Sequence, residues 1–559
     1  MLSPAPSPVP RTAAAAPAAG RRAGRALLAL VPLVALVLAL VPGCARHGAD
    51  DSLPDPPAVP GGAYTVALTE PDHLTPGRTT SSYALQVIQG LFDPPVSLDP
   101  SDGHAVPLAA ESLTSDDQRV WTLRVRPGGT FHNGEPVTAR SFAAAWNAAA
   151  YGPNGWGSNG YFSQIAGYDE LNPADGAQPT TRELPGVEVV DDATLRVTLS
   201  APFSQFPMLL AFPAFAPLPS AAFTDPDGYD RHPVGNGPYA MDGDWRHNLR
   251  IDLRRAAGYA GLRPPMADQV HFRIFTSKDT AFTELRAGHV DFMASVPAAR
   301  AYEAKRTFGR RYSVRPSGTM DYLGLPLWDR RYANPELRRA LSMAIDRRGI
   351  TRAVFNEVFA PADSLVAAMI PGHRAGACGD TCAYRPAEAK ELFDRAGGFT
   401  GTLELYFANS DPTYEQWMTA VANELRQNLG IRDIAFRKMS GADLGPILNG
   451  RKATGPYRQN WVVDYPSVQN YLAGLLGRDN RTGWSNPAFD DALARGNAAA
   501  TPAESIAHYH EAEDIALTEL PLIPLWNWQD QTVWSSRIGN VLVDPYVAGL
   551  HLEAVTVRH

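Results

Sequence analysis

The N-terminal segment constrains this chain most, because it decides on which side of a membrane the rest of the chain folds. Three arginines within residues 21–25 precede an apolar run at 26–41, and the small residue Gly43 follows. This order is typical of a secretory signal peptide. The run has about 16 residues, whereas a membrane-spanning helix needs about 20. We therefore predict a cleaved signal peptide over residues 1–43 and folding of the remaining chain outside the cytoplasm.

The residues around the predicted cleavage site also suggest a lipid anchor. Residues 41–44 (VPGC) resemble the lipobox of bacterial lipoproteins, in which the Cys, here Cys44, is lipidated and becomes the first residue. The alternative is an ordinary signal peptide followed by a chance Cys. Residues 44–61 are rich in Pro, Gly and Asp, which is typical of a flexible tether. We predict an extracytoplasmic protein held by lipid at Cys44 to the outer face of the cytoplasmic membrane.

Composition excludes several classes of protein. With 45% hydrophobic and 19% charged residues, the chain is too apolar to be disordered, and after the leader it lacks the repeated apolar runs of a polytopic membrane protein. The formal charge is −8, and it becomes −12 without residues 1–43, which hold four Arg and no acidic residue. Nucleic-acid binders are more often basic, so we expect no nucleic-acid partner. A large globular body remains.

Two further cysteines, Cys378 and Cys382, lie close together in the body of the chain. An oxidising compartment favours a disulfide between them. A zinc site would need two more ligands nearby, and the neighbourhood offers only His373. We predict a disulfide that braces this segment locally.

Periodicity and turn residues predict strands and helices in mixed order. The expected strands cover 62–68, 121–125, 187–190, 194–199, 249–253 and 269–275, and the expected helices cover 82–92, 138–150, 278–287, 335–347, 386–396, 412–429, 487–496 and 502–519. The order lacks the strict alternation of a doubly wound fold. It predicts an α/β (mixed α+β) chain with a mixed sheet and several lobes.

Six segments, in order, resemble the family 5 substrate-binding proteins of ABC importers, the dipeptide- and oligopeptide-binding class. They are residues 85–93, 121–139, 233–239, 334–347, 461–466 and 520–525. Parts of two of these blocks combine Pro, Gly and Asn, which favour turns. We interpret 126–134, with its His132, as scaffold turns and 235–239 as a turn where the chain passes between lobes. The resemblance spans the body of the chain from about residue 62.

The resemblance implies a two-lobed, hinge-closing fold of the periplasmic-binding-protein type II, with an extra inserted domain. Lobe I would comprise 62–98, 225–318 and 517–559, the extra domain II would comprise 99–224, and lobe III would comprise 319–516. It implies a monomer that captures oligopeptides or dipeptides between the lobes and delivers them to membrane permease subunits. ATP hydrolysis would belong to partner subunits, and no cofactor is expected.

One motif, residues 461–466 (WVVDYP), points to the binding site. A carboxylate within an aromatic and β-branched strand is costly to bury unless a partner neutralises it. The resemblance implies that Asp464 pairs with the α-ammonium of a bound peptide. Trp461 would wall the first side-chain pocket, the backbone near Val462 and Val463 would pair with the ligand as an added strand, and Tyr465 belongs to the same motif. The alternative is a surface Asp beside packed aromatics.

Further contacts are expected from the opposite side of the cleft. Arg78 and Thr79, in the loop before the first helix, match the region that touches ligand in the family. Trp156 and Tyr161 are expected to line the mouth of the cleft. Packing is the alternative role for both aromatic side chains.

An enzyme is the competing interpretation, and the sequence gives it little support. His508 and His510 lie two positions apart on an expected helix, so they point to different faces. The sequence lacks the zinc-protease His-Glu-x-x-His, the Gly-x-Ser-x-Gly elbow and a phosphate-binding Gly-rich loop. The two carboxylates of a glycosidase are defined by their distance in space, so the sequence alone does not identify such a pair. We expect no catalytic residue and no metal site. The remaining alternatives are another solute on the same fold, such as a nickel chelate, haem, sugar or opine, or a receptor for a peptide signal.

Overall fold

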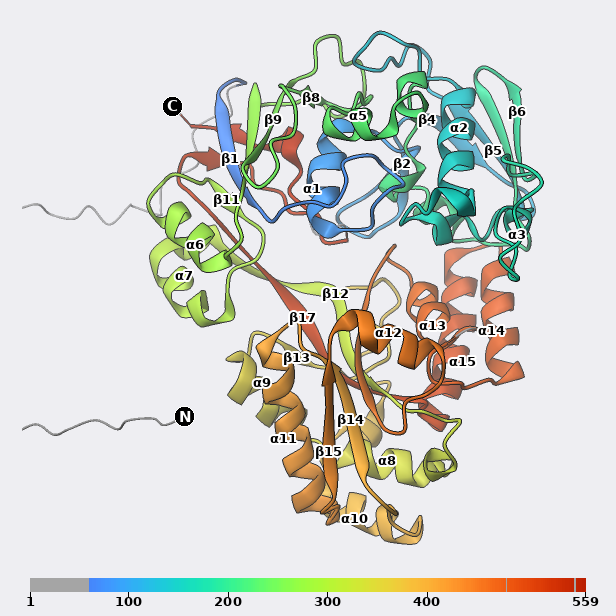
Figure 1. Cartoon of the computed structure of the whole chain (residues 1–559), viewed down its shortest axis with the longest axis vertical. Helices are drawn as coiled ribbons and strands as arrows, with labels where there is room; N and C mark the ends of the chain where they lie inside the picture. Colours follow the sequence, from blue (N-terminus) through green and yellow to red (C-terminus); the bar gives the residue numbers. More distant parts are fainter. Residues whose placement is uncertain (1–59, 479, 547–548, 559) are drawn as a thin grey trace, which may run out of the picture. The chain divides into compact units, whose positions relative to one another are not determined.

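The computed structural model describes residues 60–558 apart from 479 and 547–548 (Figure 1). The predicted signal peptide, the lipidation at Cys44 and nearly all of the tether lie outside the described residues. Within the described part, no helix is long and apolar enough to cross a membrane.

A mixed sheet of eleven strands runs through the body of the protein. Its order is β15 (Ile434–Met439), β14 (Leu403–Ala408), β16 (Tyr457–Val462), β12 (Tyr312–Gly324), β17 (Leu522–Trp534), β11 (Phe292–Met293), β1 (Ala63–Leu68), β10 (Gln269–Ile274), β9 (Arg250–Arg255) and β8 (Tyr239–Met241), with β13 (Ala360–Pro361) paired to β17. β1 runs parallel to β10 and β11, and β14 runs parallel to β15 and β16, whereas the other pairs are antiparallel.

A second, antiparallel sheet lies in the segment predicted as domain II. Its order is β4 (Ala110–Thr114), β5 (Val120–Val125), β7 (Thr194–Thr198) and β6 (Val187–Asp191). The helices α2 (Ala139–Ala150), α3 (Tyr168–Leu171) and α4 (Phe206–Leu209) belong to the same segment. Two short antiparallel pairs join β2 (Val96–Leu98) to β3 (Ala105–Pro107) and β18 (Ile538–Gly539) to β19 (Thr556–Val557).

The remaining helices divide between the other two predicted parts. Lobe I carries α1 (Ser82–Leu91), α5 (Pro226–Arg231), α6 (Lys278–Arg286) and α7 (Ala301–Phe308). Lobe III carries α8 (Pro335–Met343), α9 (Arg347–Phe355), α10 (Pro386–Arg395), α11 (Pro412–Leu429), α12 (Gly441–Asn449), α13 (Val468–Leu476), α14 (Pro487–Ala498) and α15 (Pro502–Glu519).

The buried hydrophobic residues form separate cores, which divide the protein into two bodies. One continuous core joins lobe I, with Tyr64 and Phe272, to domain II, with Trp146 and Phe215. The larger cores of lobe III are separate from it. The long strands β12 and β17 run between the two bodies and pair along much of their length (Figure 1). These two strands are therefore the place where a hinge motion would bend the chain.

Local caps account for the helices that the sequence predicts best. α11 begins after Asp411, whose carboxylate accepts a hydrogen bond from Thr413 N, and it ends at Gly430 with φ of 79°. α15 begins after Thr501, whose hydroxyl accepts from Glu504 N. An N-cap acceptor, a Pro at the first helical position and a left-handed Gly are strong local signals.

The prediction of one helix over 335–347 was wrong. α8 ends at Met343, and α9 begins at Arg347. The carboxylate of Asp346 accepts a hydrogen bond from Gly349 N, so this residue caps a new helix instead of continuing the old one. The predicted turns meet each other: His132 N donates to Gly235 O, and a Cβ on Gly235 would lie 1.8 Å from the carbonyl oxygen of Leu91.

Two of the predicted domain limits fall inside regular elements. The limit between 318 and 319 lies within β12, and the limit between 516 and 517 lies within α15. The domain ranges stay predictions, and the names lobe I, domain II and lobe III are kept below for the ranges given above.

Candidate functional site

The strand β16 leads into the predicted binding motif and has one unpaired edge. On one side it pairs with β12 from Gly324↔Tyr457 to Thr319↔Val462. On the other side, β14 bridges it only at Tyr406↔Tyr457. From Arg458 onward, no other described strand pairs with the second edge of β16.

A cavity of about 510 Å³ lies beside the end of this strand. We call it the Asp464 pocket. Domain II and lobe III both contribute to it. Its lining residues are Thr80, Gly157, Gly160, Tyr161, Ser163, Gln164, Phe203, Leu209, Trp461, Asp464, Tyr465, Gln469, Asn470, Ala473 and Gly474. The absent side chain of Gly474 lets the indole of Trp461 lie against α13, since a Cβ there would lie 2.1 Å from the ring.

Asp464 is partly buried and accepts hydrogen bonds from neutral groups. Tyr161 Oη donates to Asp464 Oδ1 at 2.6 Å, and Asn470 Nδ2 donates to Asp464 Oδ2 at 3.0 Å. Among the described residues, no Lys, Arg or His forms an ion pair with this carboxylate. Burial raises the pKa of Asp464, and the hydrogen bonds from Tyr161 and Asn470 partly oppose that rise. Burial and the neighbouring charge of Asp464 likewise raise the pKa of Tyr161.

Asn470 also fixes the rest of the motif. Its Oδ1 accepts from Trp461 Nε1 at 3.0 Å and from Asp464 N at 3.1 Å. One amide side chain therefore orients both the indole and the carboxylate. Tyr465 is buried and donates its hydroxyl to Gln469 Oε1.

The hydrogen bond from Tyr161 to Asp464 joins domain II to lobe III. Nearby, Ser204 N donates to Asn497 O at 2.8 Å, and the ring centroids of Phe203 and Tyr465 lie 6.3 Å apart. The two bodies therefore contact each other directly on the side of the Asp464 pocket.

The structure brings only some of the predicted binding residues together. Trp461, Asp464, Tyr465 and Tyr161 all line the Asp464 pocket. Val463 is buried in a lobe III core, whereas Val462 is 56% exposed and lines a second cavity of about 270 Å³.

Three predicted contacts lie elsewhere. Arg78 Nη1 donates to Asp227 Oδ1 at 3.1 Å, and Thr79 is buried and donates its hydroxyl to Asp72 Oδ1 at 2.6 Å. Neither lines the Asp464 pocket, although the next residue, Thr80, does. Trp156 lines a separate cavity of about 300 Å³ together with Arg182.

The sequence prediction missed Asn470 and the helix α13 that carries it. A signal was available: Ser467, whose side chain accepts from Gln469 N, precedes Val468, Leu472 and Leu475 at helical spacing. No local feature marks Asn470 as the partner of Asp464, because that contact depends on how α13 packs against β16.

The two remaining cysteines lie outside the cleft. Cys378 and Cys382 form a disulfide, with Cα atoms 5.5 Å apart, just before α10. His373, the residue considered as a zinc ligand, instead donates a hydrogen bond from Nδ1 to Val366 O at 2.9 Å.

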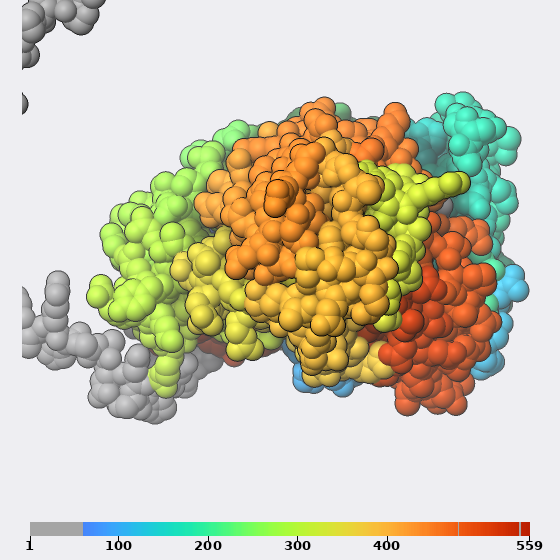
Figure 2. Space-filling model, turned by 90° about the horizontal axis from the view of Figure 1, so that it is seen from below, coloured from blue at the N-terminus to red at the C-terminus, as the bar shows by residue number. Residues whose placement is uncertain are grey.

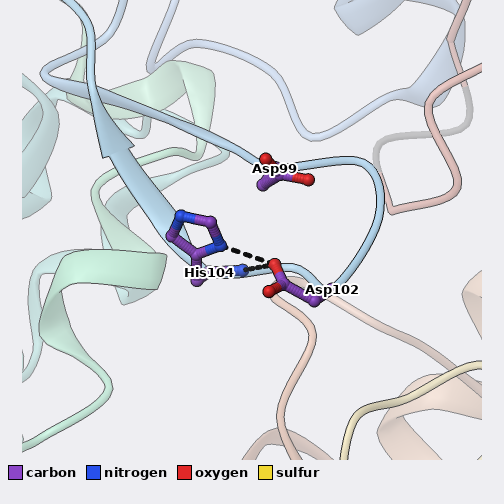
Figure 3. A group of neighbouring side chains, drawn as sticks. All are labelled: Asp99, Asp102 and His104. Carbon is purple, nitrogen blue, oxygen red and sulfur yellow. Dashed lines mark hydrogen bonds and ion pairs between the residues drawn. The ribbon is translucent and has the colours of Figure 1, made fainter.

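One group in the described residues has side chains close enough to hold a metal ion: Asp99, Asp102 and His104 (Figure 3). Asp102 Oδ1 accepts from His104 N at 3.1 Å and lies 2.5 Å from His104 Nδ1. Asp99 Oδ1 accepts from Ser101 N at 2.8 Å. These bonds stabilise a turn between β2 and β3, so turn formation accounts for the group. On α15, His508 and His510 have different partners, Arg495 and Gly372 O.

Two bodies joined by long strands, with a carboxylate-bearing cavity between them, define a cleft-binding protein of the periplasmic-binding type. Residues 104–483 match the family model described as bacterial extracellular solute-binding proteins, family 5 Middle. The chain belongs to this family. The predicted family and the predicted mixed α/β, two-lobed fold are confirmed.

Curated relatives cover most of the chain at modest identity. The periplasmic oligopeptide-binding protein OppA of Escherichia coli K12 is 27% identical over 504 residues, 85% of this chain and 86% of that protein. The probable deoxycholate-binding protein YgiS of the same organism is 26% identical over 499 residues, 87% of this chain and 89% of that protein. These relatives are solute-binding proteins, which fits the predicted non-enzymatic role.

Solved structures show the same fold. The unliganded open form of the periplasmic murein tripeptide-binding protein MppA matches with a TM-score of 0.74 and 23% identity, over 90% of this chain and 99% of that one. The Haemophilus influenzae OppA complex with the peptide RPPGFSPFR matches with a TM-score of 0.70 and 22% identity, over 89% and 98%.

Proposed function

We propose that this protein is the extracytoplasmic solute-binding component of an ABC importer and that it captures oligopeptides or dipeptides in extended form. The observation that carries the proposal is the environment of Asp464. A partly buried carboxylate with only neutral donors is costly unless a ligand supplies the positive charge. The α-ammonium of a peptide supplies that charge, and Asp464 receives it in the pocket between domain II and lobe III.

The unpaired edge of β16 supports an extended ligand. Val463 N donates to Gly318 O, toward β12. In an antiparallel pair the residues alternate, so Val462 and Asn460 direct their backbone N–H and C=O groups toward the unpaired edge. A peptide backbone pairs there as an added strand. This mode gives affinity through main-chain hydrogen bonds and tolerates varied side chains.

The relatives support a peptide more than the other solutes considered. Their names include an oligopeptide-binding, a murein peptide-binding and a glutathione-binding protein. YgiS is named for deoxycholate, which is an anion, and Asp464 would repel an anionic group in the same position. We therefore assign a peptide ligand, with closure around it presenting both bodies to permease subunits.

The proposed location follows from the N-terminal residues. Residues 1–43 act as an export signal, lipid at Cys44 anchors the chain to the outer face of the cytoplasmic membrane, and residues 45–61 tether the binding body. The acidic charge of the body keeps a monomeric binding protein soluble near that surface. Partner subunits hydrolyse ATP.

Replacing Asp464 by Ala tests the proposal. Calorimetry with a mixture of small peptides should show binding to the wild-type protein and a loss of about 2 to 5 kcal/mol in the variant, because one partner of a desolvated charge pair is gone. Asp192→Ala, at an exposed carboxylate of domain II paired with Arg140, is the matched control and should bind like the wild type. Equal affinity in Asp464→Ala and wild type would contradict the assignment.

A transport assay separates import from signalling. Cells that lack this protein should lose uptake of the bound peptide and regain it with the wild-type gene. Normal uptake in its absence would favour the peptide-signal receptor instead.

A further inference from the structure

The cleft contains a second cavity that the peptide proposal leaves unassigned. It has a volume of about 270 Å³ and is lined on one side by the strands between the two bodies. These strands contribute Ser317 and Thr319 from β12, Asn460 and Val462 from β16, and Trp528 and Asp530 from β17. Lobe I covers the other side. We call it the Asp530 cavity. Whole ligand sites usually span about 300 to 1,000 Å³, so this cavity suits one side chain of a larger ligand.

Asp530 is a partly buried carboxylate that has no positive partner in the part of the chain that the structure describes. Among the described residues, it forms no ion pair, although two cations are near in the fold. Lys278 lines the same cavity, but its Nζ donates to Ser295 Oγ at 3.0 Å. Arg315 stands opposite Asp530 in the β12–β17 register, yet it is exposed and makes no ion pair with it. Burial raises the pKa of Asp530, and a hydrogen bond from Ser317 partly opposes the rise.

An aromatic wall stands beside this carboxylate. The indole of Trp528 donates to Asp321 Oδ2 at 2.8 Å and stacks on Phe359, with ring centroids 5.1 Å apart. Both contacts hold the ring in place. Tyr83 lines the same cavity from α1. A carboxylate beside aromatic rings favours a cation, through charge pairing and through the negative face of the ring.

We propose that the Asp530 cavity binds the basic side chain, lysine or arginine, of a peptide whose α-ammonium binds Asp464. This inference rests on the proposed function. Neighbouring residues of a strand project to opposite faces, and β16 sends Trp461 to the Asp464 pocket and Val462 to the Asp530 cavity. Consecutive side chains of an extended peptide along this strand alternate in the same way. The two unpaired carboxylates therefore select a peptide with two positive charges near its N-terminus.

A panel of tripeptides tests this selection. Lysine, or norleucine as its uncharged counterpart, is placed in turn at each position of trialanine, and affinities for the full-length purified protein are measured by calorimetry. At one position, lysine should bind at least tenfold more tightly than norleucine. Asp530→Asn should remove that preference and leave the norleucine peptide within about twofold of its wild-type affinity.

One control variant and three possible outcomes separate this inference from the proposed function. Lys278→Met removes the nearby competing cation and should leave the lysine preference intact or larger. If peptides bind without preferring lysine at any position, the Asp530 inference is overturned while the proposed function stands. If the preference survives in Asp530→Asn, the cavity is wrongly assigned. If no peptide of the panel binds to the wild-type protein, both proposals fail.

Discussion

Asp321 lies on β12 and Asp464 lies just after the end of β16, and these two carboxylates differ in the charge of their partners. Asp321 is 1% exposed and pairs with Arg458 Nη2 at 2.6 Å. The indoles of Trp526 and Trp528 donate to its second oxygen at 2.9 and 2.8 Å. Within the described residues, Asp464 accepts hydrogen bonds only from neutral donors, and it lines a cavity.

This difference separates scaffold from binding site. A carboxylate whose cation is built into the protein is already neutralised, so it fixes the geometry of β12, β16 and β17. A carboxylate whose environment lacks a cation leaves that place to a ligand. Asp530 resembles Asp464 in this respect. It lines the same cavity as Trp528, whose indole donates a hydrogen bond to Asp321. The cleft thus combines the ion pair of Asp321 and Arg458 with two carboxylates, Asp464 and Asp530, that form no ion pair among the described residues and line cavities.

The largest effect on stability is expected at Asp321. Asp321→Asn removes the charge that neutralises Arg458, whose side chain is 7% exposed, and leaves a buried guanidinium unpaired. Such a loss costs about 3 to 5 kcal/mol of unfolding free energy. The shift of the urea midpoint at constant slope measures it. The double variant Asp321→Asn/Arg458→Met should recover part of the loss, because no unpaired charge remains. A single variant as stable as the wild type would show that Asp321 is not a structural charge.

Asp464→Asn should behave in the opposite way in the absence of ligand. We expect its unfolding free energy at neutral pH to equal or exceed that of the wild type, by up to about 1 kcal/mol, because a carboxylate that burial disfavours is gone. The effect depends on pH. A carboxyl group whose pKa is raised on folding stabilises the fold fully below its unfolded pKa of about 3.9, and that stabilisation is lost as the pH rises through the folded pKa.

Unfolding curves of the wild type and Asp464→Asn, measured from acidic to neutral pH, test the sign of the difference in unfolding free energy. The advantage of the variant should grow as the pH rises through the raised pKa of Asp464. A variant that is several kcal/mol less stable at neutral pH would place Asp464 with Asp321, as part of the scaffold.

The parts of the fold that the sequence predicts are those fixed by neighbours in the chain. α11 and α15 have the predicted bounds because their caps, such as Asp411 and Thr501, lie directly beside them. The 13-residue strands β12 and β17 are not predicted. β12 contains Pro316 and Gly318, which weaken a strand pattern, and its partner lies about 200 residues away.

The same distinction between local and long-range contacts applies to the candidate site. The motif that contains Asp464 is recognisable in sequence, and Tyr161 was expected near the cleft. Their direct hydrogen bond depends on the approach of domain II to lobe III, which no local pattern encodes. Asp530 has no sequence signal, because only the absence of a cation in the folded protein distinguishes it from any other strand residue.

A further effect, on the pH dependence of binding, is expected from Tyr161, which links the two bodies through Asp464. Tyr161→Phe removes one hydrogen bond that lowers the pKa of Asp464, so this pKa should rise further. Peptide affinity should then begin to fall at a higher pH on acidification, and the change at any one pH should be about 0.5 to 1.5 kcal/mol. Calorimetry from neutral to acidic pH measures the midpoint. Tyr168→Phe is the control. The hydroxyl of Tyr168 donates to Asn159 within domain II, so its removal should leave the midpoint unchanged. If the midpoint does not move in Tyr161→Phe, the ammonium of the ligand is not bound by the carboxylate that Tyr161 contacts, and the distinction between Asp464 and Asp321 would need another basis.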